Sequence, residues 1–128
     1  MKNQLGASVI AVRVGAQDVL ATADFYKELF AFSEVNRLTV DDGRLEVILS
    51  AQTPGTMMII LQRESDSAVE EGMPHGIFQI GDMESSYNKA IAMGATIVHE
   101  PSIAEEMGLK AAILNDPAGN MFELIEQI

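Results

Sequence analysis

The chain repeats one order of predicted elements, and this repeat constrains its fold more than any other feature. In each half, a β-rich run is followed by an aspartate, a helix that carries a tyrosine, and three more β-rich runs, with an offset of roughly 60 residues between the copies. A doubly wound parallel sheet would need a helix after each strand, whereas each half here supplies one helix for four strands. We therefore predict an α+β fold built from two βαβββ units.

The first predicted unit covers about residues 1–64. Asp18 is placed to cap a helix that runs to about Phe30, because an aspartate side chain accepts from the first free backbone N–H groups of a helix. Asp42-Gly43 and Pro54-Gly55 predict turns between strands. The predicted strands are 8–14, 34–40, 45–51 and 56–63. Residues 64–73 are polar and acidic and predict a linker.

The second predicted unit covers about residues 74–128. Asp82 is placed to cap its helix, and Gly94 is placed to end it in a left-handed conformation. The predicted strands are 75–80, 96–99, 109–114 and 121–126. At 128 residues the chain is most simply one domain, long enough to bury a core, so we expect residues 1–128 to form one domain.

Two groups of residues carry a resemblance to a known superfamily. They are Asp18, Ala23, Phe25-Tyr26 and Phe30-Ala31-Phe32 in the first half, and Asp116-Pro117-x-Gly119-Asn120-x-x-Glu123-Leu124 at the end. With them the chain resembles the vicinal oxygen chelate superfamily, which includes glyoxalase I, bleomycin and fosfomycin resistance proteins, and extradiol dioxygenases. The resemblance implies mixed sheets that curl around a ligand-holding cup, in a homodimer. Ala31 departs from it, because members usually end this helix with glycine; we expect a different helix end here.

Metal-dependent members of the superfamily take their ligands from the first and fourth strands of each unit. Glu123 matches the last of these positions, and His75 is in phase with a histidine ligand. Residues 4–17 contain no His, Asp, Glu or Cys, and the fourth strand offers only Gln62 or Glu64. Since a catalytic metal usually needs at least three protein ligands, we expect a metal-free cup without a cofactor. A divalent metal on Glu123 and His75 is the alternative.

The last strand explains how a carboxylate could face the ligand. Alternation places Phe122 and Leu124 on one side and Met121, Glu123 and Ile125 on the other. If the first pair packs against a helix, Glu123 points into the cup; otherwise it is a solvated carboxylate at the rim. The expected ligand-binding residues are Glu123, His75, Gln62, Arg13, Met107 and Met121. For Arg13, two roles stay open: a solvated cation or a partner of Glu123 in the cup.

Charge and cysteine content narrow the partners. A net charge of −11 disfavours nucleic acid and anionic membranes and favours a cationic ligand. The chain has no cysteine, which excludes thiol catalysis, cysteine zinc sites and disulfides. No apolar run has the length of a signal peptide core or a membrane span. We therefore expect a cytoplasmic protein.

Three functions agree with these residues. The first is binding of a small molecule without chemistry, as in the resistance proteins that sequester a drug. The second is a lyase, isomerase or dioxygenase-like enzyme in which Glu123 acts as a base or metal ligand and His75 steadies a developing enolate. The third is an interaction subunit whose cup is packed shut. Of these, we expect small-molecule binding.

Overall fold

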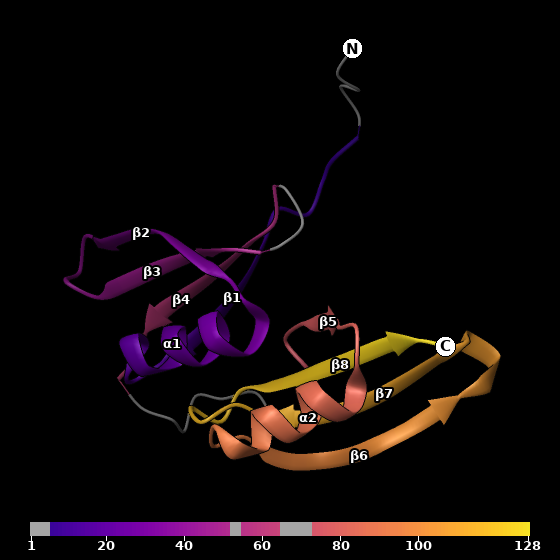
Figure 1. Ribbon diagram of the computed structural model, residues 1–128. Coiled ribbons are helices and arrows are strands. Elements are labelled where there is room, and N and C mark those ends of the chain that lie inside the picture. Colours follow the sequence, from indigo (N-terminus) through magenta and orange to yellow (C-terminus); the bar gives the residue numbers. More distant parts are fainter. Residues whose placement is uncertain (1–5, 52–54, 65–72) are drawn as a thin grey trace.

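The protein forms two four-stranded mixed sheets with two helices (Figure 1). The computed structural model describes residues 6–51, 55–64 and 73–128. The elements of the first unit are β1 (Ala11–Ala16), α1 (Val19–Phe30), β2 (Ser33–Thr39), β3 (Leu45–Ser50) and β4 (Met57–Gln62). Those of the second are β5 (Ile77–Gln79), α2 (Met83–Ala92), β6 (Thr96–Ala104), the short 3₁₀ helix η2 (Glu105–Met107), β7 (Leu109–Asn115) and β8 (Met121–Gln127).

Each sheet has the same topology, which confirms the prediction of two βαβββ units. The strand order is β1-β4-β3-β2 in the first sheet and β5-β8-β7-β6 in the second. In both, the first strand runs parallel to the fourth, and the other pairs are antiparallel. The helix therefore crosses over between the first strand and the rest of its own unit. The two edge strands β1 and β5 each have one neighbour among the described strands.

The predicted element bounds agree with the structure except in two places. β1 begins at Ala11, three positions later than the predicted 8–14 strand. β6 runs past His99 and through Pro101 to Ala104, because an edge strand tolerates a proline that has no N–H to donate. Most of the predicted linker (residues 65–72) and Pro54 of the predicted turn lie outside the described residues.

Both helix caps occur as predicted, and one helix end differs from our expectation. The side chains of Asp18 and Asp82 accept hydrogen bonds from the N–H groups of Ala21 and Ser85, each at 3.0 Å. We expected α1 to avoid a left-handed end because its residue there is alanine. Ala31 nevertheless adopts φ 57° and ψ 38°, the left-handed conformation. This conformation costs alanine about 1 kcal/mol relative to glycine, and the neighbouring Phe30 and Phe32 pack against the core.

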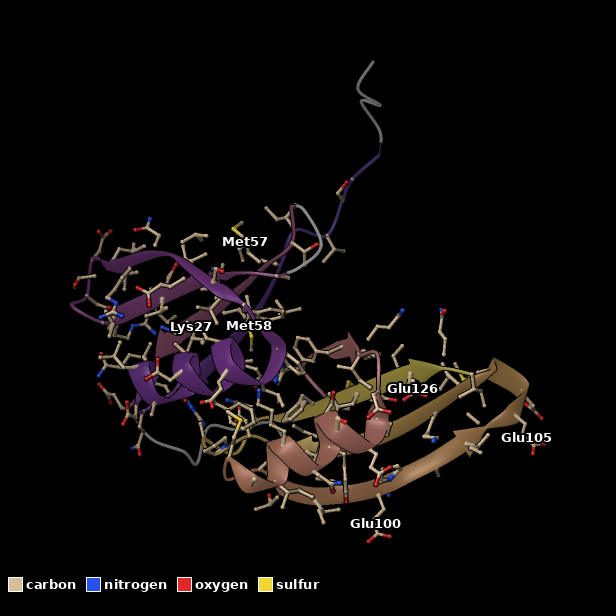
Figure 2. All side chains as sticks on the ribbon, in the orientation of Figure 1. Lys27, Met57, Met58, Glu100, Glu105 and Glu126 are labelled. Carbon is tan, nitrogen blue, oxygen red and sulfur yellow. The ribbon has the colours of Figure 1, made fainter. Side chains whose placement is uncertain are left out.

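Both helices lie between the two sheets (Figure 1). The inward faces of the sheets supply alternate residues to one core with the helices, as strand alternation requires. Figure 2 shows this for Met58, which points toward α1 while its neighbour Met57 lies on the other face. The largest fully buried side chains are Tyr26, Phe122, Leu49, Met58, Ile60, Met83, Leu114, Leu124 and Val47. Consequently, the helix-free face of each sheet points outward, and the two sheets do not close around a cup within one chain.

None of the helices in residues 6–51, 55–64 and 73–128 is long and apolar enough to cross a membrane.

Candidate functional site

The helix-free face of the second sheet carries Glu123 between two isoleucines. In the strand register, Glu123 of β8 lies opposite Ile77 of β5 on one side and Ile113 of β7 on the other. Phe122 and Leu124 are fully buried on the helix side, so the condition for an outward Glu123 is met. Met121 and Ile125 lie on the same face by alternation. The face is thus an apolar surface with a half-buried carboxylate in its middle strand.

A bulge in β6 turns His99 onto this same face. Ile97 lies opposite Leu114 of β7, whose side chain is buried on the helix side. Regular alternation would also direct His99 toward the helix side. The register shifts at Val98, so that His99 instead lies opposite Ile113. Bulges of this kind redirect single side chains. The row across the face is therefore Ile77, Glu123, Ile113 and the exposed His99, which lies in the second strand of its unit.

The helix-free face of the first sheet is also apolar, with charges near its edge strand. Arg13 of β1 lies opposite Ile59 of β4, which lies opposite Ile48 of β3. The next row contains Leu61 and Glu46. Arg13 is exposed, and since the two helix-free faces point to opposite sides, it does not reach Glu123 of its own chain. Two roles were left open for Arg13, and within the single chain it is the solvated cation.

His75 and Gln62 do not share a face with Glu123. Alternation predicted that His75 would point the same way as Ile77, but Gly76 interrupts the strand. The His75 ring instead lies 6.2 Å from the Phe78 ring, on the helix side. Gln62 is likewise on the helix side, where its side-chain oxygen accepts from the N–H of Leu45 at 3.1 Å. The pair Glu123 and His75, required by the enzymatic hypothesis, is not assembled within one chain.

Of the two methionines expected at the ligand, one lies on the face of Glu123. Met121 precedes it by two residues in β8 and is half-buried. Met107 is the last residue of η2, at the far end of the β6–β7 hairpin, and 73% of it is exposed. Within the single chain, Met107 therefore does not lie beside Glu123.

His75 belongs to a buried polar cluster. Its Nε2 lies 3.4 Å from the hydroxyl of Tyr26, which donates to the Asp116 carboxylate at 2.5 Å. Burial lowers the pKa of the His75 imidazole, and the nearby Asp116 carboxylate offsets only part of this effect. Burial also raises the pKa of Tyr26, and Asp116 adds to the rise. Both side chains are therefore neutral near pH 7 and act here as hydrogen-bonding groups.

The Asp116 turn joins the two units, a role that its local motif did not predict. Besides Tyr26, the Asp116 side chain accepts from the N–H groups of Ala118 and Asn120, both at 2.9 Å, and from the Asn120 amide at 3.2 Å. The Asn120 amide also donates to the carbonyl of Gly15 in β1 at 2.9 Å. The motif correctly predicts a β-hairpin turn, closed at Gly119 with φ 93°. Its long-range partner Tyr26 has no signal in the local sequence.

A second contact holds the same turn against the first unit. The Arg63 guanidinium donates to the carbonyl of Ala118 at 2.9 Å. To reach it, the Arg63 side chain passes over Gly15, where an added Cβ would lie 2.7 Å from the Arg63 Cδ. A side chain at position 15 would therefore force the Arg63 side chain to shift. The two units are held in one arrangement by several contacts.

The donor set does not fit a metal ion within one chain. Among the residues that the structure describes, no three His, Cys, Asp or Glu side chains lie together as a metal group. Glu123 has His99 two strands away, with Ile113 between them, and His75 on the opposite side of the sheet. Within one chain, neither histidine therefore lies beside Glu123 as a second ligand.

Comparison with known proteins agrees with the fold. The family model described as a glyoxalase-like domain matches residues 9–125. An enzyme of the glyoxalase/bleomycin resistance protein/dioxygenase family from Burkholderia phytofirmans PsJN has a similar structure, with a TM-score of 0.75 and 21% identity. The match covers 95% of this chain and 100% of the other. These similarities confirm the predicted superfamily.

Two further similar structures are those of an antibiotic binding protein and of a fosfomycin resistance protein with bound ligands. TnmS3, an antibiotic binding protein from Streptomyces sp. CB03234, has a TM-score of 0.76 and 15% identity over 98% of this chain and 100% of its own. A mutant of FosX, a fosfomycin resistance protein from Listeria monocytogenes, was crystallised with Mn(II) and 1S,2S-dihydroxypropylphosphonic acid. Its TM-score is 0.72, with 15% identity over 95% of this chain and 93% of its own. At these identities, the similarity establishes a common fold.

Proposed function

This chain belongs to the glyoxalase-like domain family, and from that premise we propose that it binds a small, cationic, amphipathic molecule around Glu123 without a metal. The binding surface is the helix-free face of the second sheet. TnmS3, an antibiotic binding protein, and the FosX mutant, crystallised with a small phosphonic acid, share this fold. We place the protein in the cytoplasm, where a sequestering protein would meet such a molecule.

One observation carries this proposal: a half-buried carboxylate lies in the middle of an apolar face. Glu123 has Ile77 and Ile113 on either side in the register, and Ile125 next on its own strand. An apolar ligand body can cover the isoleucines, while a positively charged group pairs with the carboxylate. The net charge of −11 attracts cations toward the protein as a whole. His99 at the other end of the row offers a further hydrogen bond.

We further propose that a second copy of the chain completes the cup. The two helix-free faces of one chain point to opposite sides, so neither has a facing wall. The edge strands β1 and β5 are each paired on one side in the described part of the chain. Ile77 in β5 is 64% exposed, and Ile10, just before β1, is 57% exposed. A twofold pairing of β1 with the β5 of a second copy would cover these residues and bring Arg13 toward the second copy's ligand face.

The dimer proposal predicts a mass of about two chains. Light scattering at micromolar concentration should give a dimer for the wild type, and Ile77→Lys should shift it toward the monomer, because a charge at the paired edge opposes strand addition. Ile103→Lys is the matched control, since Ile103 is 58% exposed but lies in β6, at the other edge of the same sheet. A monomeric wild type, or dissociation caused only by Ile103→Lys, would contradict the proposal.

The binding proposal predicts a charge effect at Glu123. Proflavine, a planar cationic dye, and bleomycin should bind in isothermal titration, and Glu123→Gln should weaken binding by about tenfold or more, because an ionic hydrogen bond is lost. Glu126→Gln is the control. It removes the same charge from the same strand, but Glu126 lies on the helix side, where it accepts from the N–H of Met83 (Figure 2).

Two results would count against this function. Equal weakening by both variants would show that overall charge, not the Glu123 face, determines affinity. Stoichiometric Ni, Zn, Mn or Fe in protein purified without chelator, lost in Glu123→Gln, would contradict the metal-free site. In that case, Glu123 would be a metal ligand, with the remaining donors supplied across the dimer.

A further inference from the structure

A cavity of about 510 Å³ lies where the two units meet. Its walls come from the end of α1, the start of β4, β5 and α2. This volume is within the range of small-molecule sites, which often lie between structural units. Most of its wall residues are on the helix side of the sheets; Ile77 also belongs to the proposed binding surface, whereas Glu123 does not line the cavity.

One wall of the cavity consists of three phenylalanine rings. Phe30 and Phe78 stack with their centroids 4.6 Å apart and an angle of 24° between the rings. Phe32 lies 5.4 Å from Phe30 at an angle of 44°. All three are only partly buried against the core. The rings therefore keep free surface on the cavity side, which suits the face of a flat aromatic molecule.

The rest of the wall contains flexible apolar groups and a few polar ones. Met57 and Met58 supply thioethers, which adapt to irregular ligand shapes. Thr56, Gln79 and Ser86 supply two hydroxyls and an amide. Among the described residues that line the cavity, none carries a charge. A charged ligand would lose its hydration here without gaining a partner.

We propose that this cavity is a second binding site, for a neutral, flat aromatic molecule with one polar hydrogen-bonding group. The rings of Phe30, Phe32 and Phe78 take the aromatic face, and the polar groups of Gln79 and Ser86 orient it. This ligand is neutral, whereas the ligand proposed for the Glu123 surface is cationic. The cavity proposal rests on the three phenylalanine rings and the surface proposal on Glu123, so each can fail without the other.

The test uses two fluorescent probes with one skeleton. N-phenyl-1-naphthylamine is neutral, and 8-anilinonaphthalene-1-sulfonate adds a sulfonate to the same rings. In about 0.3 M NaCl, which screens the net charge of the protein, the neutral probe should bind saturably and at least about tenfold more tightly than the sulfonate. Absence of saturable binding, or equal affinity for the two probes, would overturn the proposal.

Variants then locate the probe. Ser86→Phe and Thr56→Phe fill the cavity from two different walls, and each should weaken binding of the neutral probe by about tenfold or more. Asn88→Phe adds the same ring at an exposed position of α2 and should leave binding unchanged. Thermal melts select the filling variant that keeps its fold. Unchanged affinity in a folded filling variant, or a loss in Glu123→Gln as large as that in Ser86→Phe, would show that the probe binds elsewhere and overturn the proposal.

Discussion

Asp116→Ala should lower the free energy of unfolding by about 4 kcal/mol, because it leaves several buried donors without an acceptor. Asp116 is 3% exposed and accepts four hydrogen bonds, from the Tyr26 hydroxyl, two backbone N–H groups and the Asn120 amide. Three of these four donors lie in the turn itself, so the turn also loses its local closure. The Tyr26 contact joins the units, and its loss weakens their packing as well.

Urea denaturation at one fixed protein concentration measures this effect, since dimer dissociation would otherwise change the midpoint. Asp42→Ala is the matched control. Asp42 is also a turn aspartate, but its side chain is exposed and pairs with Arg44, and such surface pairs contribute about 1 kcal/mol or less. If both substitutions cost the same, the Asp116 cluster would not be the contact that holds the units together.

Phe122→Ala should lower the free energy of unfolding by about 3–5 kcal/mol, the usual cost of removing a fully buried aromatic ring. Phe122 of β8 is 0% exposed and contacts rings from both units. Its centroid lies 6.1 Å from Phe25 and 6.0 Å from Tyr26, both in α1, and 6.2 Å from Phe78. The substitution would therefore leave a cavity between α1 and the second sheet. The surrounding side chains cannot fill this cavity without moving both units.

Thermal and urea denaturation should show the loss, with Ile97→Ala as the comparison. Ile97 is an apolar residue of the same sheet, but it is 50% exposed, so its truncation should cost well under 1.5 kcal/mol. A small effect for Phe122→Ala would mean that the second sheet packs against α1 more loosely than its rings indicate.

Local patterns predicted the elements because the forces that form them act over a few residues. Asp18 and Asp82 cap helices through N–H groups three positions away. Alternation in β8 predicted that Phe122 would be buried and that Glu123 would face away from the helices, and both hold. The predicted turn at Asp116 follows from contacts within five residues.

Contacts between residues far apart in the chain were not predicted, because no short sequence pattern indicates them. Alternation failed for His75, since Gly76 breaks the strand, and for His99, since a bulge shifts its register. The pairing of Tyr26 with Asp116 spans 90 positions. The placement of both helices between the sheets likewise depends on how the units pack, so the residues expected in one cup are distributed over opposite sides of the chain.

Strand alternation gives neighbouring residues of β8 different roles. Phe122 and Leu124 point toward the helices and sustain the fold, while Met121, Glu123 and Ile125 point outward and contribute little to the core. Substitutions at the outward positions can therefore change what the surface recognises at small cost in stability. Mutations at every second residue of such a strand can therefore change which ligand binds, while the fold stays intact.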